Sequence, residues 1–235
     1  MSEISRLSGV FFEPKQTFAD IAQRPRWLIP LLLVIVSGLC YCYAFSQHVG
    51  WERIMQHALE TNERMAQMPP EQRDRVIAMQ VKYGPLEAYA GVLFGVPVSF
   101  LVIAGVLLGI VAGLMSVPVR FKQVFSIVCY ASLPGVIFAV LAIVVVFLKN
   151  PDDFNIQNPL AFNVGAFLDP TTTSKFIYSI ATALDLFSLW TILLIATGLS
   201  AAGGKKLSFG GALTSVIVPW GVFVLARAAV AGILS

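Results

Sequence analysis

The sequence has little charge and few chemically reactive side chains for its length. Of its 235 residues 12% are charged and 57% are hydrophobic, and the chain holds three cysteines and two histidines. Soluble domains carry roughly 25% charged residues, which their wetted surface requires. The formal net charge of +3 and the lack of a dense basic stripe exclude a nucleic-acid footprint. The composition therefore predicts a membrane protein that binds no nucleic acid.

Catalytic and metal-binding patterns are also missing. The sequence contains no glycine-rich phosphate loop, no nucleophile elbow and no zinc-protease helix. Cys40 and Cys42 point about 200° apart on a helix, and the spacing of His48 and His57 places them on opposite faces of a continuous helix. We expect these cysteines and Cys129 to be buried structural residues. We predict no metal, no cofactor and no enzymatic activity.

Long hydrophobic runs are what the sequence does contain. A helix needs about 20 apolar residues to cross a hydrocarbon core of ~30 Å, because each residue adds ~1.5 Å. Five runs are long enough: 27–45, 88–115, 125–148, 176–199 and 210–234. They predict an all-α integral membrane protein, a five-transmembrane-helix bundle over 27–235 that follows an N-terminal segment over 1–26. Pro97, Pro134 and Pro219 lie within runs, and we expect them to kink the helices.

The positions of Lys and Arg predict the orientation, since cytoplasmic loops carry an excess of these residues. The N-terminal segment and the turns after the second and fourth runs together hold eight basic and three acidic residues. The loops on the opposite side, 46–87 and 149–175, together hold seven basic and nine acidic residues. We therefore expect the N-terminus in the cytoplasm and the C-terminus on the extracytoplasmic side.

The N-terminal segment is predicted to be an amphipathic helix. Ile4, Leu7, Val10 and Phe11 recur at helical spacing and form one apolar face, and Pro14 suits the first position of a continuing helix. Basic residues opposite the apolar face favour a helix that lies in the lipid headgroup region. A short helix packed on the base of the bundle fits the same pattern, and the two arrangements are compatible.

The extracytoplasmic loop over 46–87 is predicted to be a helical hairpin, because about 42 residues are too many for a structureless connection. Its second helix follows Pro69 and Pro70 and is expected to end at Gly84 and Pro85, a C-cap followed by the start of the next span. The apolar stripe of the first helix is Trp51, Ile54, Met55, Ala58 and Leu59. The hairpin either presents a partner or ligand surface or forms a lid over the helix ends.

Two charged residues lie inside the predicted spans. By the helical rise, Asp185 is roughly 13 Å and Arg227 roughly 10 Å from the outer helix ends. A charge within the bilayer usually pairs or lines a wet cavity, so we hypothesise an intramembrane ion pair between them. The pair either fixes the register of two antiparallel helices or forms part of a polar pathway.

The second run carries glycines four residues apart. Small residues at this spacing let two membrane helices approach closely. They either close the bundle internally or join the protein to a membrane-protein partner or a second copy of itself. The predicted helix-packing residues are Gly91, Gly95, Gly105, Gly109 and Gly113.

Several segments resemble a known family. The segment FFEPKQTF at 11–18, which contains Glu13, Pro14 and Phe18, and RPRW at 24–27 resemble the N-terminal segment of the Yip family (Ypt/Rab-interacting proteins), in its bacterial branch. Three later segments are also similar: CYASLP, which ends in Pro134, DLFSLW from Asp185, and the turn KKLSFGGAL at 205–213.

The resemblance implies a five-span protein with a cytoplasmic N-terminus in the bacterial inner (plasma) membrane. Eukaryotic members are associated with Rab-type GTPases and membrane traffic, and their cytoplasmic N-terminal region is longer than the 26 residues here. We expect a non-enzymatic membrane scaffold or accessory subunit that acts through contacts with lipids, a partner protein or a second copy. The alternative is a small transporter or channel with a polar site near Asp185 and Arg227.

Overall fold

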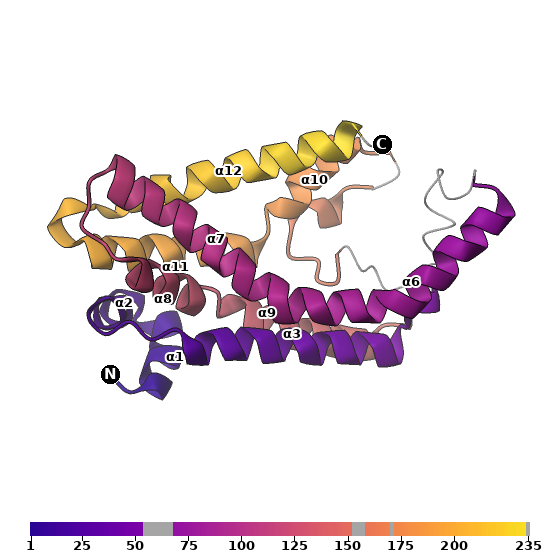
Figure 1. The fold of residues 1–235 in the computed structure, drawn as a ribbon, viewed down its shortest axis with the longest axis horizontal. Helices are drawn as coiled ribbons and strands as arrows, with labels where there is room; N and C mark the ends of the chain where they lie inside the picture. Colours follow the sequence, from indigo (N-terminus) through magenta and orange to yellow (C-terminus); the bar gives the residue numbers. More distant parts are fainter. Residues whose placement is uncertain (54–67, 152–157, 170–171, 234–235) are drawn as a thin grey trace.

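The fold is a bundle of long apolar helices, seen here in a computed structural model that describes residues 1–53, 68–151, 158–169 and 172–233. Five helical stretches in these residues are long and apolar enough to cross a membrane: Leu28–His48, Pro70–Leu114, Phe121–Leu148, Leu186–Lys206 and Phe209–Ile233. The prediction of five spans is confirmed. The N-terminus lies near one end of the long axis, beside α1 and α2, and part of α6 occupies the other end (Figure 1).

The first and last spans agree closely with the sequence prediction. Helix α3 is Leu28–His48, and helix α12 is Phe209–Ile233. Helix α12 begins after Ser208, whose Oγ accepts a hydrogen bond from the N–H of Gly211 at 3.2 Å and so satisfies a donor that the first helical turn leaves free. Both helices expose many large apolar side chains, as expected for surfaces that face lipid.

The second span is the C-terminal part of a single 45-residue helical stretch. It consists of four consecutive elements: α6 (Pro70–Ala90), the π-helix η1 (Gly91–Gly95), α7 (Val96–Leu108) and the π-helix η2 (Gly109–Leu114). The predicted end of a helix at Gly84 and Pro85 is therefore wrong, since α6 runs through both residues. The first helix of the predicted hairpin, with Ile54, Met55, Ala58 and Leu59, lies outside the described residues.

Gly84 has a packing role rather than a capping one. A Cβ atom at this position would lie 2.7 Å from Cε3 of Trp51, closer than atoms can pack. Glycine is therefore the residue that lets α6 pass against the Trp51 ring. The π-helix η1 ends two residues before Pro97, whose missing N–H leaves the carbonyl four residues earlier, within η1, without its usual donor.

The third span is interrupted where the sequence predicted a kink. Helix α8 (Phe121–Ala131) ends before Ser132, and α9 (Pro134–Leu148) begins with Pro134 in its first turn. The ring of Pro134 fits the first turn of a helix, where no backbone donor is needed. Pro219 lies inside α12, and the bend expected there stays a prediction.

The fourth span begins later than the sequence predicted. The run that we assigned to 176–199 is split into α10 (Lys175–Ala183) and α11 (Leu186–Gly203). A short 3₁₀ helix, η4 (Val164–Phe167), packs on α10, and α10 packs in turn on α12. The span therefore starts at Leu186 and ends with the 3₁₀ turn η5 (Gly204–Lys206).

Two short helices at the N-terminus pack on the base of the bundle. Helix α1 is Glu3–Phe12 and α2 is Pro14–Gln23, so Pro14 takes the predicted first position. Helix α2 packs against α8 and α11, where Phe18 is fully buried. Of the two arrangements considered for this segment, the structure contains the packed one. Ile4 and Phe12 are nevertheless 80% and 84% exposed, which leaves α1 an outward apolar side.

Candidate functional site: a charged cluster at the base of the bundle

A buried arginine lies at the centre of the base. The Arg6 side chain is only 2% exposed, and its Nε and Nη2 atoms lie 2.7 and 2.6 Å from Oδ2 of Asp20. Arginine is almost never fully buried without a partner, and two contacts to one carboxylate supply that partner. This pair joins α1 to α2.

Glu3 connects the same cluster to two of the spans. Its Oε2 accepts a hydrogen bond from the hydroxyl of Tyr130 at 2.6 Å, and its Oε1 accepts one from Nη1 of Arg26 at 3.2 Å. Nη1 of Arg6 lies 3.5 Å from the same Oε1. Since Tyr130 is fully buried in α8 and Arg26 lies just before α3, Glu3 fixes α1 to both.

The chain terminus completes the cluster. The amino group of Met1 lies 3.1 Å from Oδ1 of Asp20, and Nε2 of Gln123 donates to the carbonyl of Ala22 at 2.8 Å. We call Met1, Glu3, Arg6, Asp20, Arg26 and Tyr130 the base cluster. Its charged groups are engaged with one another, so their arrangement holds α1 and α2 against the spans.

The charges of the base cluster alter each other's protonation. Burial by itself raises the pKa of Asp20, but hydrogen bonds from Arg6 and from the amino terminus outweigh it and leave this pKa below its ordinary value. Burial by itself lowers the pKa of Arg6, but the hydrogen bonds with Asp20 and Tyr130 outweigh it and leave this pKa above its ordinary value. The pair is therefore ionised at neutral pH.

A groove of about 380 Å³ opens beside the base cluster. It is lined by side chains from α1, from the start of α3 and from the first turn of α8: Glu3, Pro25, Arg26, Trp27, Leu28, Ile29 and Lys122. We call it the base groove. It combines two cationic side chains with apolar residues of a membrane span.

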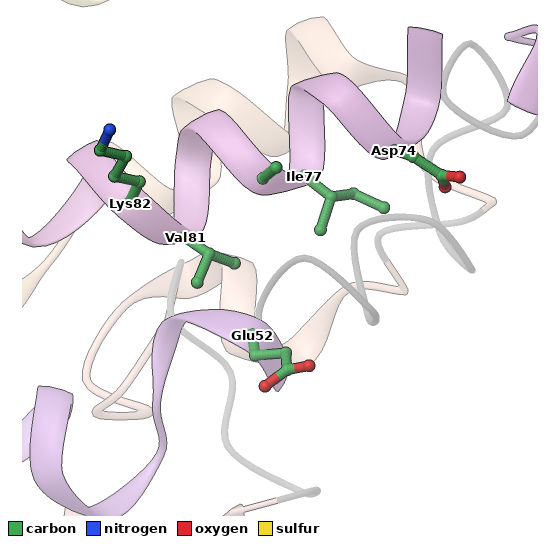
Figure 2. A pocket seen from close by; sticks show the side chains of 6 residues that line it. Glu52, Asp74, Ile77, Val81 and Lys82 are labelled. Carbon is green, nitrogen blue, oxygen red and sulfur yellow. The ribbon is translucent and has the colours of Figure 1, made fainter. Parts of the chain in front are cut away.

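A second groove, of about 390 Å³, lies at the opposite end, between the segment after α3 and helix α6. Figure 2 shows Ile77 and Val81 on the side of α6 that is turned toward Glu52, whereas Lys82 points away. Asp74 completes its polar rim. This groove belongs to the predicted extracytoplasmic loop, and neither groove includes Asp185 or Arg227.

The predicted intramembrane ion pair is not formed in this structure. Oδ1 of Asp185 accepts hydrogen bonds from the N–H groups of Phe187 and Ser188 at 2.9 and 3.0 Å, and so caps α11. Arg227 is exposed on α12. Among the described residues, the ion pairs all belong to the base cluster. Asp185 therefore lies immediately before the fourth span and not inside it.

The predicted helix-packing glycines face away from the bundle. In the part of the chain that the structure describes, no atom outside the local helix lies within 4 Å of the position that a Cβ would take at Gly91, Gly95, Gly105, Gly109 and Gly113. Internal closure of the bundle, one of the two roles considered, is not what these glycines do in this structure. Close internal approach occurs at Gly198 of α11 instead, where a Cβ would collide with Ile127 and lie 2.9 Å from Cδ1 of Phe18.

The motif residues of the family resemblance lie at structurally important positions. Phe18 is buried at the contact between α2 and α11, and Pro14 and Pro134 begin helices. Glu13 is exposed and precedes α2 without a capping hydrogen bond from its side chain. The segment CYASLP contains Tyr130 of the base cluster.

The cysteines and histidines are placed as follows. Cys129 is buried, as we expected, but Cys40 is exposed on α3, so the expectation of burial is wrong there. The ring of His48 lies 5.2 Å from that of Phe147, between centroids, and His57 lies outside the described residues. In the part of the chain that the structure describes, no three His, Cys, Asp or Glu side chains gather as metal ligands.

The base cluster is what the sequence reasoning missed. In the prediction from sequence, Glu3, Arg6 and Asp20 were counted only in the charge balance of the cytoplasmic side. A signal was present, because Glu3, Arg6 and Val10 share one helical face at spacings of three and four. An arginine on the apolar face of a short helix indicates a buried partner.

Comparison with known proteins identifies a family. A family model described as the Yip1 domain matches residues 8–230, which include the second half of α1, all of α2 and the spans up to the last turn of α12. No curated protein and no solved structure matches the chain.

Proposed function

The chain belongs to the Yip family of membrane proteins, and from that premise we propose that it acts as a non-enzymatic membrane scaffold or accessory subunit. We assign its main protein contact to the glycine face, defined as Gly105, Gly109 and Gly113. This face binds a helix of a partner membrane protein or of a second copy of the chain.

The observation that carries this proposal is the open space beside the glycine face. All three glycines are exposed, and among the described residues no atom outside the local helix lies within 4 Å of the position of a Cβ. Apolar side chains flank them, among them Val102 and Val106. Between helices in lipid, close backbone approach at such small residues supplies the packing that drives association.

The base cluster supports a structural role for the cytoplasmic end. Its carboxylates accept from Tyr130, Arg26, Arg6 and the amino terminus, so its charges stabilise the position of α1 and α2. We propose that this end faces the cytoplasm, because its turns carry most of the excess basic charge, and that the membrane is the bacterial plasma membrane implied by the family resemblance.

The scaffold is favoured over a transporter or channel by the position of the two charges that suggested transport. Asp185 uses a carboxylate oxygen to cap α11. Arg227 is exposed on α12. Among the described residues, no acidic side chain forms an ion pair with it. A polar pathway would need these groups to face a common cavity.

Photo-crosslinking in native membranes tests the proposal. A photoreactive amino acid replaces Val106 beside the glycine face, and in a matched variant it replaces Val222, which is exposed on α12. We expect discrete protein adducts from position 106, their loss when Gly109→Leu is added, and lipid adducts alone from position 222. Lipid adducts alone from both positions would refute the glycine face as a protein contact.

Gly221→Leu provides the control for bulk. Gly221 of α12 also has nothing within 4 Å of the Cβ position but does not lie in a row of glycines. The position-106 adducts should survive this substitution. Equal loss in Gly109→Leu and Gly221→Leu would show that added bulk, and not the glycine face, causes the effect.

A further inference from the structure

The base groove has a mixed lining that neither the family match nor the scaffold proposal explains. Arg26 and Lys122 supply positive charge, while Leu28 and Ile29 begin the first span and are 55% and 41% exposed. Trp27 lies between the two kinds of side chain. The volume of the base groove, about 380 Å³, is within the range of small-molecule sites.

The cationic side chains of the base groove have N–H donors that are available to a ligand. The side chain of Arg26 is 71% exposed and gives Nη1 to Glu3, and a guanidinium carries five N–H donors in all. Lys122 is exposed, and its ammonium has no ion pair within the described residues. Arginine and lysine together suit a phosphate, which takes two N–H bonds from arginine and a point charge from lysine.

The carboxylate of Glu3 does not prevent an anion from binding. Both of its oxygens already accept hydrogen bonds, from Tyr130 and from Arg26. The groups around the groove are the cations Arg6, Arg26, Lys122 and the amino terminus, against the carboxylates of Glu3 and Asp20. The local charge is therefore positive.

The apolar part of the groove decides which kind of phosphate fits. Trp27 is held by an edge-to-face contact with Phe125, with ring centroids 5.4 Å apart, and tryptophan at the end of a span lies at the level of the lipid headgroups. Below it, Leu28 and Ile29 continue into the hydrocarbon region as the first turn of α3. A ligand that fills both parts has a phosphate and an alkyl chain.

We propose that the base groove binds an anionic glycerophospholipid from the leaflet on the N-terminal side. Its phosphate lies between Arg26 and Lys122, and an acyl chain lies along Leu28 and Ile29. Basic pockets between spans on the cytoplasmic side are suited to such headgroups. The site is separate from the glycine face, so it does not depend on the proposed protein contact.

Native mass spectrometry of the full chain tests the site. The protein is reconstituted in nanodiscs of equal phosphatidylglycerol and phosphatidylcholine, released, and scored for the lipids that remain bound. We expect the wild-type protein to retain phosphatidylglycerol. The double variant R26Q/K122Q should lose it by about tenfold or more, as expected for the removal of two charges near an anionic surface.

The matched control is K205Q/K206Q, which removes two exposed lysines from the turn at the same end of the bundle but outside the groove. This variant and Gly109→Leu should retain the lipid as wild type does. Since Arg26 also bonds Glu3, K122Q alone is tested as well and should show a partial loss even if the double variant does not fold.

Three results would overturn the proposal. The first is equal retention of the two lipids by the wild-type protein, and the second is equal loss in the groove variants and in K205Q/K206Q. The third is displacement of phosphatidylglycerol by an equal concentration of inorganic phosphate, which would show a free-anion site. Absence of protein adducts from position 106 without any glycine substitution, with phosphatidylglycerol still retained, would refute the glycine face and leave the lipid site standing.

Discussion

The hydroxyl of Tyr130 in α8 donates a hydrogen bond of 2.6 Å to Oε2 of Glu3 in α1, across 127 residues of sequence. Tyr130 is fully buried, so this bond connects the first helix of the chain to the first part of the third span. The same carboxylate accepts from Arg26, at the start of the first span. One side chain of α1 therefore connects two spans at the base of the bundle.

Tyr130→Phe should release α1 from the base. The substitution keeps the ring and removes the donor, which leaves one oxygen of the partly buried Glu3 carboxylate without its partner. Hydrogen bonds to charged groups contribute about 1.5–3 kcal/mol to stability. We expect the free energy of unfolding to fall by this order, which thermal unfolding of the purified protein measures. Tyr43→Phe is the control, because Tyr43 is 61% exposed on α3. Equal unfolding temperatures for both variants would contradict the role of the bond.

The pairing of Arg6 and Asp20 should make the docking of α1 and α2 sensitive to acid. The pKa of Asp20 is below its ordinary value of 3.8 in the folded protein. A carboxylate whose pKa is lower in the folded than in the unfolded protein stabilises the fold at any pH above its unfolded pKa. This stability is lost as the pH falls through the folded pKa. Protease protection of residues 1–26 should therefore be full at neutral pH and decline below about pH 4. Asp20→Asn should reduce protection at neutral pH and flatten its decline, and an unchanged profile in Asp20→Asn would rule out this pair as the cause.

Gly198 should be the least replaceable glycine of the spans. A methyl group there would collide with Ile127 and crowd Phe18, and overpacking of a core costs about 1–3 kcal/mol. We expect Gly198→Ala to lower the unfolding temperature and to expose the N-terminal segment to protease. Gly221→Ala, at an open position of α12, should have neither effect. If the two variants behave alike, the contact between α2 and α11 is not as close as described.

The sequence predicted features that depend on run length and backbone chemistry. Five apolar runs give five spans, Pro14 begins a helix because proline fits a first turn, and the third span is interrupted at Pro134, where a kink was predicted. It did not predict features that need a distant partner, such as the hydrogen bond to Tyr130 or the Trp51 ring that requires glycine at position 84. Asp185 belongs to a third kind: its capping chemistry was readable, but the continuous apolar run was given more weight than the helix start that aspartate favours.

Substitution of Asp185 separates a cap from an ion pair. An asparagine retains the oxygen that accepts from the N–H groups of Phe187 and Ser188, whereas an alanine does not. A lost cap costs about 0.5–2 kcal/mol, so Asp185→Ala should lower the unfolding temperature while Asp185→Asn keeps it near that of the wild type. Arg227→Gln should add to either variant independently, since the two side chains make no direct contact. A loss as large in Asp185→Asn as in Asp185→Ala, together with non-additivity toward Arg227→Gln, would restore the intramembrane ion pair and, with it, the case for a polar pathway.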